Sequence, residues 1–170
     1  MLAAVPEAQP PVAPHPDIAH LAPLLGVWRG SGRGEYPTIA SFDYHEEIHF
    51  GHVGRPFLTY RQRTRHAEDG RPLHAETGYL RCAGPDRIEL ILAHPTGITE
   101  ICEGTLKVGD DSLRMELGST ALGRTTTAKI VTSLGRSIHL SGDTIDYSLR
   151  MAAVGQPEQH HLAASLRRAE

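Results

Sequence analysis

The stretch of sequence that decides the fold is Gly26-Val27-Trp28-Arg29-Gly30-Ser31-Gly32-Arg33-Gly34-Glu35-Tyr36-Pro37. It contains the only tryptophan of the chain and four of its glycines, three of them at every second position. This spacing cannot continue a helix, so it indicates a strand or a tight crossing that another backbone or a flat ligand approaches closely. A large ring beside bare backbone is typical of a barrel that closes over its core.

The same glycines have two other interpretations. Gly30 to Gly34 also fit a flexible loop, and this segment alone leaves that alternative open. A phosphate-binding loop is disfavoured, because the dinucleotide fingerprint needs G-x-G-x-x-G between a strand and a helix. Here the spacing is G-x-G-x-G, and Tyr36-Pro37 follows it.

Length and composition predict one domain with one core. The chain has 170 residues, of which 39% are hydrophobic. Its formal net charge is -3 and it has no basic run, so nucleic acid is not expected as a partner. The sequence has neither a membrane-length apolar stretch nor a secretory signal pattern, so we expect a cytoplasmic protein without a membrane partner. Cys82 and Cys102 are expected to be free, half-buried thiols rather than parts of a disulfide or a zinc site.

The N-terminal segment differs from the rest of the chain. Five prolines among alanines can neither continue a helix nor pair in a sheet, so residues 1–16 are predicted to be a disordered or extended tail. Residues 17–170 are predicted to form a single domain. At its start, Asp17 can cap a short helix that would plug one end of the fold. The apolar residues at helical spacing are Ile18, Leu21, Leu24 and Leu25.

From Trp28 onward, short alternating runs separated by turn residues predict an all-β domain. The clearest run has Phe42, Tyr44, Glu46, Ile48 and Phe50 on one face and Asp43, His45, Glu47 and His49 on the other. Further strands are predicted at 57–66, 73–83, 87–94, 98–107, 112–117, 125–134, 137–141, 144–154 and 160–168, with a looser stretch at 118–124 and a turn at Gly135-Arg136.

About ten strands joined by short hairpins predict an antiparallel up-and-down β-barrel, with a flattened sandwich as the alternative. A barrel of about eight strands is already only just filled by side chains, so a larger one leaves a cavity. A cavity of that kind can hold a ligand.

Several short motifs, taken in order, match one known family. Gly26-Val27-Trp28-Arg29-Gly30-Ser31-Gly32 resembles the G-x-W-x-G-x-G motif of nitrobindins, which are small heme-binding β-barrels. The similarity continues through Tyr36-Pro37-Thr38-Ile39, His74-Ala75-Glu76-Thr77-Gly78-Tyr79-Leu80-Arg81, Pro95-Thr96-Gly97 and His161-Leu162-Ala163-Ala164-Ser165-Leu166-Arg167-Arg168. It therefore covers about residues 17 to 168.

The resemblance implies a ten-stranded barrel, distantly similar to fatty-acid-binding proteins and lipocalins, with one heme b near its open end. It implies that the ferric protein isomerises peroxynitrite to nitrate and that the ferrous protein binds nitric oxide. We therefore expect a heme-dependent peroxynitrite isomerase. Two alternatives stay open, a non-catalytic carrier or sensor of nitric oxide or heme, and a barrel for a fatty-acid-like ligand. The last would need interior arginines, and Arg61, Arg63 and Arg65 are candidates, although a solvated outer face is favoured for them.

Alternation along the last strand leaves two candidates for the iron ligand. His161, Ala163, Ser165 and Arg167 share one face, and His160, Leu162, Ala164 and Leu166 share the other. Alternation does not decide which face points inward. The family's H-L-x-A-x-L pattern implies that His161 is the axial ligand and the catalytic residue, and small Ala163 and Ser165 beside it would leave room for a flat macrocycle. A strand histidine bonded to a backbone carbonyl is the alternative interpretation.

The resemblance implies three further heme-binding residues. Thr38, Lys129 and His74 occupy positions that in the family approach the heme, its propionates or the pocket. A lysine ammonium suits a carboxylate at the pocket mouth, and Lys129 is expected within a strand. An exposed barrel lysine and a hydrogen-bonded strand histidine are the alternative interpretations. His94 is expected at a strand end near the rim and receives no role.

Two other constellations are not expected to be sites. His45, Glu47 and His49 share a strand face at about 6.6 Å spacing, which does not converge on a metal, so a solvated outer face is predicted. The sequence has no G-x-S-x-G elbow, so acyl transfer is not expected. The sequence leaves open whether the barrel forms a homodimer.

Overall fold

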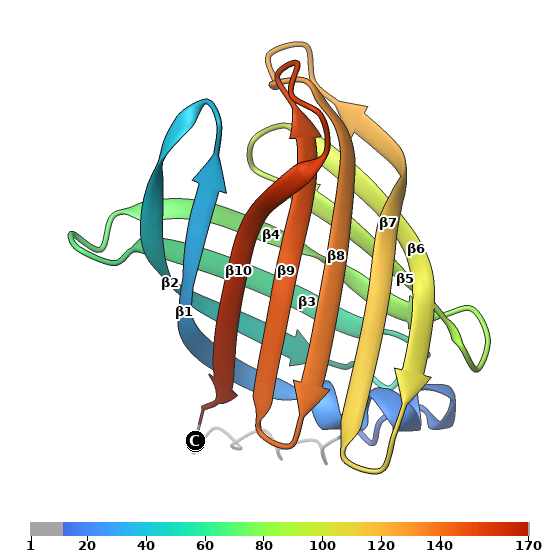
Figure 1. The fold of residues 1–170 in the computed structure, drawn as a ribbon. Helices are drawn as coiled ribbons and strands as arrows, with labels where there is room; N and C mark the ends of the chain where they lie inside the picture. The colour runs from blue at the N-terminus through green and yellow to red at the C-terminus, as the bar shows by residue number, and fades with distance from the viewer. Residues whose placement is uncertain (1–11, 170) are drawn as a thin grey trace, which may run out of the picture.

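The computed structural model describes residues 12–169, and within this range a short 3₁₀ helix precedes ten strands. The elements are η1 (Pro16–Leu24), β1 (Gly26–Tyr36), β2 (Ile39–Gly51), β3 (Leu58–His66), β4 (Pro72–Cys82), β5 (Arg87–His94), β6 (Ile98–Val108), β7 (Ser112–Arg124), β8 (Val131–Ser141), β9 (Thr144–Ala153) and β10 (Gln159–Arg168). Each strand pairs antiparallel with the next, and β1 pairs with β10, so the sheet is a closed barrel (Figure 1). The barrel prediction is confirmed, and most of the predicted tail lies outside the described residues.

The glycine-rich strand β1 closes the barrel. It pairs with β2 on one side and with β10 on the other, in a register that runs from Trp28↔Arg168 to Gly34↔Leu162. A Cβ atom on Gly30 would collide with the backbone carbonyl oxygen of Ser165 in β10. The spaced glycines therefore let a second backbone approach closely. This confirms the strand interpretation, and the flexible-loop alternative is wrong.

The helix η1 covers one end of the barrel, and Figure 1 shows it at the same end as the β6–β7 and β8–β9 turns, behind the ends of these strands. Its buried residues Ile18, Leu21 and Leu24 are three apart, which matches the three-residue turn of a 3₁₀ helix. The predicted cap is wrong, because Asp17 lies inside the first turn and its backbone N–H donates to Nδ1 of the N-cap residue His15 at 3.2 Å.

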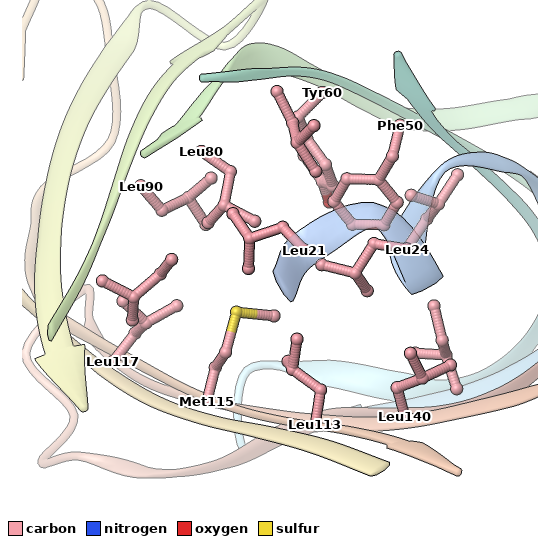
Figure 2. Packing of buried hydrophobic residues seen from close by; sticks show 14 of the residues in the cluster. Leu21, Leu24, Phe50, Tyr60, Leu80, Leu90, Leu113, Met115, Leu117 and Leu140 are labelled. Atoms are coloured by element: carbon pink, nitrogen blue, oxygen red, sulfur yellow. The ribbon is translucent and has the colours of Figure 1, made fainter. Parts of the chain in front are cut away.

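Trp28 joins this helix to the barrel. Its indole Nε1 donates to the backbone oxygen of Leu24 at 2.7 Å, and the side chain is completely buried. Figure 2 shows Leu21 and Leu24 pointing into a cluster that contains Met115 and Leu140. The apolar core therefore lies at the helix end of the barrel, and the other end is free to hold a ligand.

The second half of the chain differs from the predicted strands. The strand β7 continues to Arg124, and residues 125–130 form a loop that contains Lys129, so the prediction of a strand at this lysine is wrong. Gly135-Arg136 is not a turn but lies within β8, because the Arg136 side chain points inward and is neutralised there by buried carboxylates. Among the described residues, the helix is too short to cross a membrane.

Candidate functional site

A cavity of about 680 Å³ lies at the end of the barrel away from η1. This volume falls in the range of small-molecule and cofactor sites, about 300–1,000 Å³. The turns around its mouth are β1–β2, β5–β6, β7–β8 and β9–β10, and Figure 1 shows three of them, β1–β2, β7–β8 and β9–β10, at the end opposite the helix. Its apolar wall includes Phe42, Ile98, Val131, Leu149 and Met151. A layer of buried polar side chains, called the polar layer below, lines the same cavity beside core residues such as Ile48 and Leu90.

One half of the polar layer is built around Glu46. This carboxylate is 4% exposed and accepts hydrogen bonds from Gln62 Nε2 at 2.8 Å and from the Tyr147 hydroxyl at 2.7 Å. Burial raises the pKa of Glu46 to about 7, although both hydrogen bonds lower it. The amide oxygen of Gln62 has no hydrogen-bond partner among the described residues. This part of the layer can therefore gain or lose a proton near neutral pH.

The other half is an ion-pair network around Arg136. Its guanidinium contacts Glu100 Oε1 and, at 3.3 Å, Glu76 Oε2, and all three side chains are buried. Burial alone would raise the pKa of Glu76, but the charge of Arg136 and a hydrogen bond from His74 lower it to about 2. The Tyr60 hydroxyl donates to Glu76 Oε1 at 2.8 Å. Glu76 is therefore ionised at neutral pH.

His161 enters the cavity because β10 contains a β-bulge. His160 pairs with Arg150 and Leu162 with Leu149, so His161 is an extra residue opposite no partner in β9. A bulge interrupts strict alternation and re-aims a side chain. As a result, both His161 and Leu162 line the cavity, whereas alternation predicts that only one of them does.

The bulge also changes the residues next to the ligand candidate. Beyond it, Ala164 and Leu166 are buried, whereas Ser165 is exposed and Ala163, on the same outer face, is half-buried. The prediction that Ala163 and Ser165 leave room beside His161 is therefore wrong. Ala163 and Ser165 do share one face, as alternation predicts, but the bulge places the His161 side chain on the opposite face of the strand.

The imidazole of His161 is held in one orientation. Its Nδ1–H donates to the backbone oxygen of Glu35 at 3.0 Å, and its ring meets the Tyr36 ring edge-on with centroids 5.2 Å apart. The Tyr36 hydroxyl is fixed in turn by the backbone of Ala153, whose N–H donates to it at 2.9 Å. Partial burial lowers the pKa of His161. The ring is therefore neutral at physiological pH, with Nε2 left as the nitrogen for a metal.

His74 and His94 lie together in the cavity wall. His74 follows a register shift between β3 and β4, where the hydroxyl of Thr64 bonds both its backbone N–H, at 3.0 Å, and its backbone carbonyl. Its Nε2 lies 3.2 Å from Nδ1 of His94. The His94 side chain is 7% exposed, and its Nε2 lies 3.2 Å from Glu100 Oε2. His94 ends β5, as the sequence predicts, but its side chain lies in the interior rather than at the rim.

Two of the predicted heme-binding residues lie at the cavity mouth. Thr38 is in the β1–β2 turn and Lys129 in the loop before β8, and both are exposed and line the cavity. Together with His74 and His161, they are brought to one cavity from four separate segments. The structure therefore collects all four residues that the family resemblance implies.

The histidines and arginines that the sequence places on outer strand faces do lie on the outside of the barrel. Glu47 forms ion pairs with Arg29 at 2.8 Å and Arg63 at 2.7 Å on the outside of the barrel. The other residues on these outer faces are His45, His49, Arg61 and Arg65. Both cysteines are free, with Cys82 half-buried and Cys102 buried against Glu100.

Sequence reasoning missed the residues of the polar layer. Glu46 shares its strand face with Tyr44 and Ile48, so a charged residue among inward positions was the signal. Glu100 similarly alternates with Cys102 in β6. Arg136 gave no such signal, because the glycine before it makes the pair look like a turn.

Comparisons with known proteins show which family this barrel belongs to. The family model described as "THAP4-like, heme-binding beta-barrel domain" matches residues 17–168. A Nocardia farcinica protein named "Peroxynitrite isomerase" is 71% identical over 167 residues, which are 98% of this chain and 99% of that protein. "Peroxynitrite isomerase 2" of Mycobacterium avium is 59% identical over 91% of this chain and 96% of its own length. The crystal structure of Rv2717c from M. tuberculosis matches with a TM-score of 0.90 and 54% identity, covering 93% of this chain and 100% of that one.

Proposed function

Because the chain belongs to the THAP4-like, heme-binding β-barrel domain family, as the resemblance to nitrobindins implies, we propose that it is a heme b protein that isomerises peroxynitrite to nitrate. Relatives of nearly equal length carry the name peroxynitrite isomerase at up to 71% identity. Heme supplies the iron at which peroxynitrite rearranges, and the same iron binds nitric oxide when it is ferrous. The protein's contribution is the pocket and the axial ligand.

The cavity residues fit a heme. The wall is apolar, as a porphyrin requires, and the volume of about 680 Å³ suits a cofactor. His161 offers Nε2 from a neutral ring, and the bond from its Nδ1–H to the Glu35 carbonyl is the kind of partner that orients metal-bound histidines. Lys129 at the mouth is placed to pair with a propionate, and Thr38 can hydrogen-bond one.

The observation that carries the proposal is the orientation of His161. A histidine that the barrel turns inward by a bulge, fixes through Nδ1 and packs against Tyr36 is preorganised to ligate at Nε2. This chain's other contribution is to exclude water, since the wall beside His161 is made of aliphatic side chains such as Leu149 and Met151.

The two alternatives differ in their support. A fatty-acid-like ligand needs a free interior arginine, but Arg61, Arg63 and Arg65 are on the outer face. The interior Arg136 is already paired with two carboxylates. A carrier or sensor of nitric oxide or heme would use the same residues as the isomerase, so only turnover separates these two.

The setting of the protein follows from the same features. We infer a cytoplasmic location, because two free thiols suit a reducing compartment. The small-molecule ligands would be peroxynitrite and nitric oxide, and a net charge of -3 without a basic run disfavours nucleic acid. Light scattering would decide whether the barrel is a homodimer.

The test is a hemin titration followed by absorption, with wild type, His161→Ala and His160→Ala side by side. His160 is the matched control, because it is the exposed neighbour within the same strand. We expect a sharp Soret band at one equivalent in wild type and in the control, and its loss in His161→Ala. In stopped-flow measurements, wild type and His160→Ala should accelerate the decay of peroxynitrite to nitrate, and His161→Ala should not. A His161→Ala protein that keeps both the band and the rate would refute the assignment.

A further inference from the structure

A second metal-ligand set lies in the cavity wall, apart from the residue assigned to the heme iron. It consists of His74 and Glu76 on β4 and His94 at the end of β5. Among the described residues, this is the group of histidine, cysteine and acidic side chains whose ligand atoms converge closely enough to share one ion. We propose that His74, Glu76 and His94 form a binding site for a divalent transition-metal ion such as zinc, in the same cavity as the heme but with a ligand set that does not include His161.

The strand geometry brings the three side chains to one point. His74 and Glu76 are two residues apart on β4 and therefore point to the same side of the sheet. Extending the β4–β5 register one pair beyond Thr77↔Ala93 places Glu76 opposite His94. The register shift at the start of β4 lies next to His74, and the Thr64 hydroxyl holds the His74 backbone there.

The distances match those of a bound ion. His74 Nε2 and His94 Nδ1 are 3.2 Å apart, and Glu76 Oε2 lies 3.6 Å from the first and 3.5 Å from the second. A triangle with these sides has its centre about 2.0 Å from every corner, which equals the zinc–nitrogen and zinc–carboxylate bond lengths. The two imidazole nitrogens lie within hydrogen-bond distance of each other, and the two distances to Glu76 are at or just beyond that limit. The three atoms surround one point that an ion could occupy.

The outer partners are those of metal-bound histidines. His94 would ligate through Nδ1, and its Nε2–H would donate to Glu100 Oε2 at 3.2 Å. A carboxylate behind the histidine fixes the tautomer and makes the ligand more basic. For His74, binding at Nε2 moves the ring proton to Nδ1, and the side chain is 35% exposed, so that proton can reach water.

Charge and access also favour a cation. The buried carboxylates of Glu76 and Glu100 face a single guanidinium, that of Arg136, which leaves one negative charge in excess. All three ligand residues line the cavity, so an ion can enter through the mouth and keep an open position for water or a small anion. Two histidines and one carboxylate with an open position form the set used by catalytic zinc and non-heme iron.

The test is a titration of the heme-free full chain with Co²⁺, followed by its visible absorption, and with Zn²⁺ by calorimetry. We expect one equivalent to bind in wild type. His74→Asn and His94→Gln should weaken Zn²⁺ binding by more than about 100-fold, since even outer partners contribute about 10–100-fold. His45→Ala is the control for adventitious surface histidines, because His45 is exposed on the outer face. The His94→Gln variant keeps an amide that can still donate to Glu100.

The result that overturns the proposal is wild-type protein without stoichiometric Co²⁺ or Zn²⁺ binding, or equal affinity in both histidine variants. If either variant fails to fold, anomalous diffraction at the zinc edge from wild-type crystals decides, since the peak must lie between the three side chains. His161→Ala should keep the Co²⁺ spectrum while losing the Soret band. The metal titration contains no heme and the hemin titration contains no added metal, so failure of one proposal is distinguishable from failure of the other.

Discussion

Replacing Glu46 by glutamine should remove a pH-dependent contribution to the stability of the barrel. Burial raises the pKa of this carboxyl from 4.5 to about 7, against the hydrogen bonds from Tyr147 and Gln62 that favour the charged form. The folded state therefore holds a proton between these two pH values that the unfolded chain releases. Stability from Glu46 is fully present below about pH 4.5 and is lost as the pH rises through about 7.

The size of the effect follows from the same shift. The difference between 4.5 and about 7 corresponds to about 3.4 kcal/mol of unfolding free energy, at about 1.4 kcal/mol for each pKa unit. The isosteric Glu46→Gln variant has no titrating group at this position, so it should not share this loss. Other titrating groups are common to both proteins and cancel in the comparison.

The assay is urea unfolding of the heme-free chain at pH 5 and pH 8. The unfolding free energy of wild type minus that of Glu46→Gln should fall by about 2.5 kcal/mol between the two pH values, because part of the loss already occurs below pH 5. Glu68→Gln, an exposed carboxylate, is the control and should leave the wild-type pH dependence in place. A difference that stays constant within about 1 kcal/mol, or that rises with pH, would refute the argument from burial.

Three further variants test the closure of the barrel and the support of the iron ligand. Trp28→Phe removes the indole bond to the Leu24 carbonyl and some buried volume, so urea unfolding should show a loss of about 2–4 kcal/mol, and an unchanged midpoint would contradict this. Gly30→Ala forces a Cβ into the backbone of β10 and should lower the unfolding free energy by more than about 2 kcal/mol. In the control Gly118→Ala, the added Cβ meets no atom within 4 Å, so the loss should be under about 1 kcal/mol. Similar losses in both variants would disprove the close approach of β1 and β10. Tyr36→Phe keeps the ring but loses the hydrogen bonds of the hydroxyl to the backbone of β9. The unfolding free energy should drop by about 1–3 kcal/mol, and hemin titration should show weaker binding. Loss of stability with unchanged heme affinity would show that this hydroxyl does not position His161.

The architecture could be predicted because its causes are local. Alternation in the run around Tyr44 and Ile48, turn residues between the strands and the glycine spacing of β1 are all periodic signals within a few residues. Sequence reasoning failed at Gly135-Arg136, because what keeps β8 extended there is not local. Arg136 is neutralised by Glu76 and Glu100, which are 60 and 36 positions away in the chain.

The site was less accessible to sequence reasoning, for a related reason. The family motif implies that His161 is the iron ligand. Alternation alone could not choose between His160 and His161, and it wrongly placed Ala163 and Ser165 beside His161 in the cavity. The missing information is the bulge, and a register shift leaves no periodic signal. His94 shows the same limit, since its partners His74 and Glu100 become visible only when β4, β5 and β6 are side by side.

The bulge in β10 also predicts which insertions and deletions the family can tolerate. Deleting His161, the extra residue between His160 and Leu162, would let β10 pair without interruption with β9 and would improve the ladder. His160 would keep its outward position opposite Arg150 and could not replace the lost ligand, so the iron ligand would be absent from a barrel that folds as well as before. The extra residue in this strand therefore serves the heme site and not the stability of the barrel, so a chain that lacks it should fold as an intact barrel without heme.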